Sequence, residues 1–99
     1  MLEHLTNILK DIDLLLKDDN YKFDNTNINT IKEYLQSFKD SLEKSNDASL
    51  IDLSKVKEVS NLIYELNTTN LFSTLTDHMS NELYAFEFIL QEKLKREEV

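Results

Sequence analysis

Few residues of this chain have types and spacings that could carry out chemistry. His4 and His78 are the only histidines, and His78 lies four residues before Glu82, a spacing that places both side chains on one face of a helix. Such a pair could share a metal ion, but two ligands do not complete a site. The Glu-x-x-His motif of di-iron bundles is absent, and without cysteine there is no thiolate ligand or nucleophile. We therefore expect no metal site and no cofactor.

The polar segment 18–29 resembles a calcium-binding loop only in its content of Asp and Asn. Counted from Asp18, Lys22 occupies a ligand position and Phe23 stands where that loop requires glycine. The chain contains no glycine at all, which excludes the glycine-rich loops that hold phosphates and dinucleotides, and also the serine nucleophile elbow. No pair for acid–base catalysis stands out among the nineteen acidic residues. The sequence thus predicts a non-enzymatic protein.

Net charge and hydropathy restrict the possible partners. The formal net charge is −8, which argues against direct binding to nucleic-acid backbones or to anionic lipid surfaces. The first residues lack the basic region of a signal peptide, and no apolar run approaches the ~20 residues of a membrane span. Together with the absence of cysteine, these features predict a cytoplasmic protein.

Composition and periodicity predict an all-α fold. Glycine and proline, the main helix breakers, are both absent. Apolar residues recur at three- and four-residue steps in four segments, about 2–17, 30–44, 50–66 and 71–97. We expect one domain over residues 1–99, an antiparallel up-down-up-down four-helix bundle with a long C-terminal helix. The predicted core positions are Leu5, Ile8, Leu9, Ile12, Leu15 and Leu16, then Ile28, Ile31, Leu35, Phe38 and Leu42, then Val56, Val59, Leu62, Ile63 and Leu66, and finally Phe72, Leu75, Met79, Leu83, Phe86, Leu90 and Leu94.

Polar links separate the four predicted helices. Residues 18–29 are interpreted as a connection, because Asn and Asp favour turns over helix interiors. The segment from Thr30 to Glu33 fits a capping box at the start of the second helix. The segment 49–52 is expected to cap the third helix, and Thr69 or Asn70 the fourth.

The last predicted helix has two different apolar sides. At 100° per residue from Met79, its core residues lie within about 40°, whereas Tyr84 and Phe88 lie near 140° and 180°. Two interpretations remain open for this pair. Either a neighbouring helix or the loop after the first helix buries it, or it forms a contact surface for a partner or a second copy. The aromatics of segment 84–90 also alternate as in a strand, but the helical stripe continues on both sides, so we predict a helix.

Charge is distributed unevenly along the chain. All eleven Lys and Arg residues lie at or before Lys57 or at or after Lys93, whereas six acidic residues lie between Glu58 and Glu92 inclusive. This stretch is either an ordinary solvated face or a surface complementary to a basic protein partner. The candidate partner-binding residues are Asp77, Asn81, Tyr84, Glu87, Phe88, Gln91 and Glu92.

These features favour a small acidic protein-binding protein, such as an inhibitor, an antitoxin or immunity protein, or a regulatory adaptor. The wealth of Asn, Lys, Asp and Ile suits an AT-rich genome, so a low-GC bacterium or its phage is the expected source. In size and four-helix plan the chain resembles the small immunity proteins that protect bacteriocin producers, which are often basic. The alternatives are a self-assembling structural protein that dimerises through the last helix, and a DNA-mimic inhibitor of a nucleic-acid-binding protein.

Overall fold

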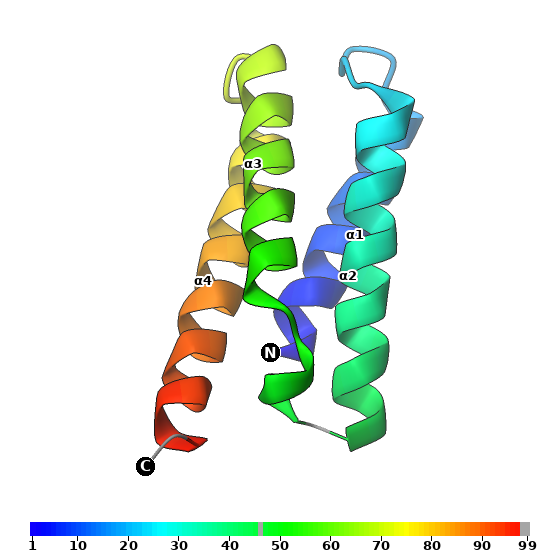
Figure 1. The fold of residues 1–99 in the computed structure, drawn as a ribbon. Helices are drawn as coiled ribbons and strands as arrows, with labels where there is room; N and C mark the ends of the chain where they lie inside the picture. Colours follow the sequence, from blue (N-terminus) through cyan, green and yellow to red (C-terminus); the bar gives the residue numbers. More distant parts are fainter. Residues whose placement is uncertain (46, 98–99) are drawn as a thin grey trace.

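The chain folds as an antiparallel bundle of four α-helices, as predicted. The computed structural model describes residues 1–45 and 47–97, without the side chain of Glu97. Its helices are α1 (Leu2–Lys17), α2 (Asn25–Ser45), α3 (Leu53–Thr69) and α4 (Thr74–Glu97), with a short 3₁₀ turn, η1 (Ala48–Leu50), before α3. The helices alternate in direction along one long axis (Figure 1), and within the described ranges there is no strand. The segment 84–90 is helical, and α4 is the longest helix, at 24 residues.

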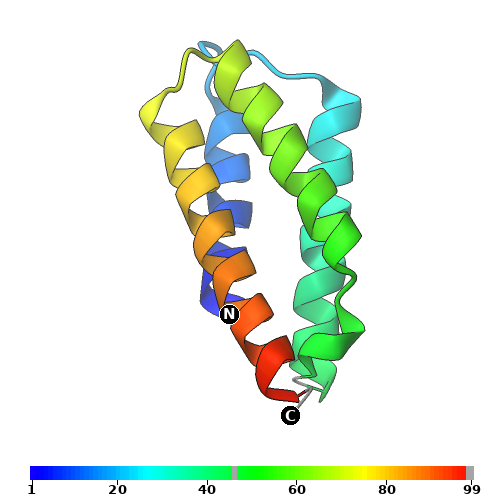
Figure 2. The same ribbon diagram turned by 60° about the vertical axis from the view of Figure 1, so that its left-hand side comes forward.

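The four helices surround one core. α1 packs against α2 and α4, and α3 packs against the same two helices, so each helix has two neighbours. Figures 1 and 2 show this arrangement from two directions, with α1 and α3 on opposite sides of the bundle. None of the helices described here is both long and apolar enough to cross a membrane.

The predicted apolar stripes form this core with two exceptions. Phe38 of α2 stacks on Phe86 of α4 with ring centroids 6.1 Å apart, near the middle of the bundle. Leu16 is 42 % exposed, because Leu15 takes the core position in the last turn of α1 and its neighbour points about 100° away. Phe72 is 53 % exposed, because it precedes α4 and does not follow the phase of that helix.

The start of α2 differs from the prediction. Helix α2 begins at Asn25, so the connection covers only residues 18–24. The cap is Asp24, whose Oδ1 accepts a hydrogen bond from the Thr26 backbone N–H at 2.8 Å. The predicted capping box at Thr30 is wrong: this residue lies inside the helix, and its hydroxyl donates to the Thr26 carbonyl at 2.9 Å.

The caps of the last two helices also shift. Asp52 caps α3 by accepting from the Ser54 backbone N–H at 2.9 Å, and Ser49 belongs to η1 instead. Asn70 closes α3 rather than opening α4, since its side chain donates to the Leu66 carbonyl at 2.9 Å. Helix α4 therefore starts later than predicted, directly after Ser73, whose hydroxyl accepts from the Thr76 backbone N–H at 3.3 Å.

The corrected cap of α2 can be tested by a pair of substitutions. Asp24→Ala should lower the free energy of unfolding by about 1 kcal/mol, because two amides at the helix start lose their acceptor. Thr30→Ala should change it by less than about 0.5 kcal/mol, because that hydroxyl only supplements a carbonyl already in the helix ladder. Urea unfolding followed by circular dichroism measures both, and a larger loss for Thr30→Ala would restore the original assignment.

Candidate functional site

The outward side of α4 carries the residues that the sequence singled out. Tyr84 is 73 % and Phe88 57 % exposed, so neither ring is covered by a helix or a loop of this chain. The loop after α1 lies elsewhere: the Lys22 backbone N–H donates to the Asn70 side-chain oxygen at 2.7 Å, at the end of α3. The interpretation that this loop buries the two aromatics is therefore wrong.

The other predicted residues lie around this pair on α4. Asp77, Asn81 and Gln91 are exposed on the same side. Glu87 and Glu92 are half-buried, and Glu92 pairs with Lys95 at 3.7 Å, one turn further along the helix. Asp77 accepts a hydrogen bond from the Asn67 side chain at 3.1 Å, which ties it to α3. All seven predicted residues thus lie on one helix, but Asp77 and Glu92 already contact other side chains of this chain.

Two further aromatics extend this surface: Tyr64, which the sequence analysis did not select, and Phe72, which it assigned to the core. Tyr64 of α3 is 63 % exposed, and its ring meets that of Phe72 edge to face, with centroids 6.4 Å apart. Tyr64 lies off the core stripe of α3 and could have been found by the same angular argument that identified Tyr84. Phe72 could not, because its position depends on the turn. We call the set Tyr64, Phe72, Tyr84 and Phe88 the aromatic face.

A groove between α3 and α4 lies within the aromatic face. It has a volume of about 200 Å³. Tyr64 lines it from α3, and Tyr84 and Glu87 line it from α4. The remaining lining residues are Ser60, Ile63, Ser80 and Leu83. Two aromatic rings and one carboxylate therefore converge on a small, partly apolar depression.

The turn that joins α3 to α4 is strained and exposes apolar side chains. Leu71 and Phe72 have φ values of 56° and 54°, in the left-handed region that costs a non-glycine residue about 1–2 kcal/mol. Leu71 is 87 % exposed. The turn is held by the Phe72 backbone N–H, which donates to the Asn67 carbonyl at 2.8 Å, and by the buried Thr76 hydroxyl, which donates to the Asn67 side chain at 2.6 Å. The strain is thus fixed by surrounding hydrogen bonds.

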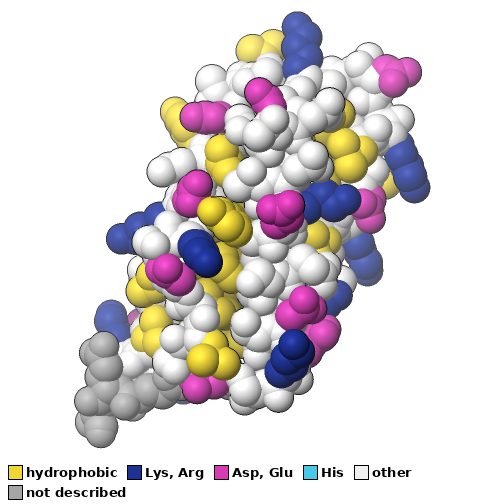
Figure 3. Space-filling model, turned by 45° about the vertical axis from the view of Figure 1, so that its right-hand side comes forward, with side chains coloured by type: hydrophobic (Ala, Val, Ile, Leu, Met, Phe, Trp, Pro, Cys, Tyr) yellow, Lys and Arg dark blue, Asp and Glu magenta, His cyan; other side chains and the backbone are white. Residues whose placement is uncertain are grey.

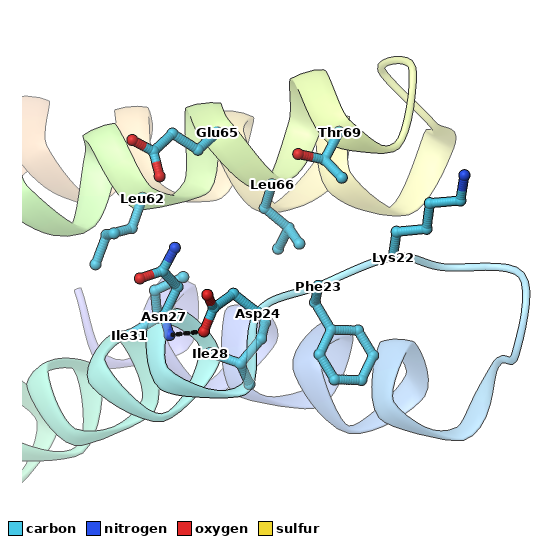
Figure 4. Close-up of a pocket in the computed structure, with 10 residues that line it drawn as sticks. All are labelled: Lys22, Phe23, Asp24, Asn27, Ile28, Ile31, Leu62, Glu65, Leu66 and Thr69. Carbon is cyan, nitrogen blue, oxygen red and sulfur yellow. Dashed lines mark hydrogen bonds between the residues drawn. The ribbon is translucent and has the colours of Figure 1, made fainter.

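A second groove lies between α2 and α3 (Figure 4). Its volume is about 380 Å³. Its apolar lining consists largely of core residues such as Ile28 and Ile31, and its only titratable side chains are Lys22, Asp24 and Glu65. Asp24 is already used as the α2 cap. Lys22 and Glu65 are therefore the remaining charged side chains on this groove.

Both histidines take part in a polar network between α1 and α4. His4 Nδ1 donates to Glu82 at 2.6 Å, and Asn7 donates to the other oxygen of the same carboxylate at 3.4 Å. His78 donates through Nδ1 to Asp11, which is only 7 % exposed, and its Nε2 lies 3.4 Å from Glu82. Within the residues that the structure describes, no three His, Cys, Asp or Glu side chains are placed to hold a metal ion. The network instead links the two helices.

The network shifts the pKa of His78 upward. The hydrogen bond to Asp11 is the largest cause, followed by the charge of that carboxylate, and the charge of Glu82 adds to it, while burial works in the opposite direction. The protonated imidazole therefore contributes stability that is fully present below its ordinary pKa of 6.5 and is lost as the pH rises through the raised value.

This pKa shift predicts how stability depends on pH. His78→Gln should destabilise the protein most below pH 6.5, and the difference from the unsubstituted chain should shrink as the pH rises through the raised pKa. Urea unfolding at several pH values measures this difference. Asp11→Asn removes the main cause of the shift and should flatten the pH dependence in the same range. A His78→Gln effect that grows with pH would contradict the assignment.

Comparison with protein-family models, with curated proteins and with solved structures gave no match. Functional inference for this chain therefore depends on its own surfaces.

Proposed function

We propose that this protein acts, without catalysis, by binding another protein through its aromatic face and the outward side of α4. The observation that carries the proposal is the exposure of four aromatic rings from α3, α4 and their turn, two of which, Tyr64 and Tyr84, line one groove. A solvated helix face needs none of them, and aromatic side chains supply much of the energy of protein–protein contacts.

Charge supports a basic partner surface. No Lys or Arg occurs between Glu58 and Glu92, so α3 and α4 carry no cationic side chain along most of their length. Asp77 and Glu87 flank the aromatic rings. Figure 3, turned so that the side of α2 comes forward, shows Lys and Arg interspersed with Asp and Glu on that face. A basic partner would approach the α3–α4 side preferentially and bind it faster at low salt.

An inhibitor, an antitoxin or immunity protein, or a regulatory adaptor would use such a surface. A basic surface in a bacterial or phage target is commonly one that handles nucleic acid, so blocking it requires acidic groups together with anchoring side chains. DNA mimicry is less well supported, because exposed rings rather than ranked carboxylates dominate this face.

The proposed role can be tested by removing the two rings on α4. Tyr84→Ala with Phe88→Ala should weaken partner binding by about 30-fold or more, as for hot-spot residues. The free energy of unfolding should change by less than about 1 kcal/mol, because both rings are exposed. The matched control is Leu14→Ala with Leu16→Ala, two exposed side chains on α1.

The readout is capture from a lysate of the source organism at about 0.05 M and about 0.5 M NaCl, with the bound proteins identified by mass spectrometry. A basic protein that the unsubstituted chain and the α1 control retain, and that the α4 variant and high salt release, supports the proposal. Equal retention by both double variants would contradict it.

Self-assembly through α4 is the alternative, and charge disfavours it. A two-fold axis through this side would bring Asp77 and Glu87 of one copy close to the same carboxylates of the other. No Lys or Arg from residues 59–92 is available to compensate them. We therefore expect sedimentation equilibrium to give the monomer mass up to about 1 mM protein. A dimer that Tyr84→Ala dissociates would replace the proposed function with self-assembly.

A further inference from the structure

The groove between α3 and α4 has the size and lining of a seat for one cationic side chain. Its volume of about 200 Å³ is smaller than the ~300 Å³ at which small-molecule pockets begin, so a cofactor or metabolite does not fit it well. Tyr64 and Tyr84 line it from different helices, and Glu87 lines it with them.

The two tyrosine side chains are accessible. Their exposed fractions are 63 % and 73 %, and the Tyr64 ring also contacts that of Phe72 edge to face. The face of an aromatic ring carries negative potential and attracts a cation placed over it. A planar guanidinium also stacks on such a face, which an ammonium group cannot do.

Glu87 is the acidic side chain of α4 that has no partner within the described residues. Glu82 is bound by His4 and Asn7, and the other two carboxylates on this part of the helix contact Asn67 and Lys95, but Glu87 makes no hydrogen bond or ion pair with a described side chain. Its half-buried position strengthens its attraction for a cation compared with a fully solvated carboxylate.

The chain's own cations do not fill the groove. Lys57, which lies two helical turns before Tyr64, is not among the lining residues. The hydroxyls of Ser60 and Ser80 line it and add acceptors for the five N–H donors of a guanidinium.

We propose that this groove holds an arginine side chain of the protein partner, with its guanidinium against Tyr64 and Tyr84 and paired with Glu87. The identity of the partner as a basic protein rests on the proposed function, but the preference of the groove for guanidinium is a property of this chain alone. Arginine is favoured over lysine because only its planar group combines ring stacking with two-point pairing to a carboxylate.

The test uses the full chain and two probes of equal charge, an acetylated hexa-arginine peptide and its hexa-lysine counterpart. Each is titrated at low salt into ¹⁵N-labelled protein. The hexa-arginine peptide should bind more tightly by about threefold or more, and the largest amide shift changes should fall on Ser60, Tyr64, Ser80, Tyr84 and Glu87. Equal affinity for the two peptides, or shifts centred on the α2–α3 groove, would overturn the proposal.

Substitutions distinguish binding of arginine in the α3–α4 groove from general electrostatic attraction to an acidic protein. Glu87→Gln should weaken hexa-arginine binding by about fivefold, and Tyr84→Leu by about twofold to fivefold, because it keeps apolar bulk but loses the ring. Tyr84→Phe should bind like the unsubstituted chain. The matched control is Glu43→Gln, an exposed carboxylate on α2 that changes net charge equally. If Glu43→Gln weakened hexa-arginine binding as much as Glu87→Gln does, the proposed arginine site in the groove would be wrong.

Capture of the natural partner distinguishes the two proposals. If Tyr84→Ala with Phe88→Ala loses the partner while Glu87→Gln retains it fully, the binding face stands and the arginine seat is wrong. If neither variant affects capture, the proposed function is wrong, whatever the peptides show. If both lose the partner and Glu43→Gln does not, both proposals are supported.

Discussion

The burial of a single apolar stripe on α4 determines most of the surface of this molecule. Met79, Leu83, Phe86 and Leu90 are at most 2 % exposed and close the core against the other helices. Because successive residues are 100° apart, fixing that stripe inward fixes Tyr84 and Phe88 outward. The exposed aromatics are therefore not an accident of side-chain placement. Burying them would require rotating α4 and withdrawing four large core residues from a packed interior, at a cost of several kcal/mol for each.

Helix existence and core membership could be predicted from periodicity alone, because they depend on local spacing. The helix boundaries could not, because they were set by single hydrogen bonds that several nearby residues could have made. Asp24 and Ser73 cap where Thr30 and Asn70 were equally plausible from type, and Asn70 serves the preceding helix. The exposure of Phe72 follows from the same shift, since a residue outside the helix does not inherit its phase.

For the candidate site too, local spacing could be predicted from the sequence, whereas features that depend on how the helices pack could not. The outward side of α4 was accessible from the sequence, but the contribution of Tyr64 and the groove required the positions of α3 and α4 relative to each other. The histidine network joins His4 to Glu82, which are 78 positions apart, and Asp11 to His78, which are 67 positions apart. It exists only because α1 and α4 are antiparallel in one particular register. No local pattern encodes such a register.

The strained backbone and the carboxylate without a described partner both lie on the α3–α4 side. Leu71 and Phe72 occupy left-handed positions where Asn or glycine would be tolerated more easily, and they expose apolar surface there. A cost of about 1–2 kcal/mol at each is appreciable beside a typical net stability of about 5–15 kcal/mol. On α4, Glu82 accepts hydrogen bonds from His4 and Asn7 of α1, which link the helix to the bundle. Glu87, only five residues further, faces the groove without a cation. One carboxylate of the helix thus contacts α1 and another lines the groove, so the surface proposed for binding would need no rearrangement of the core.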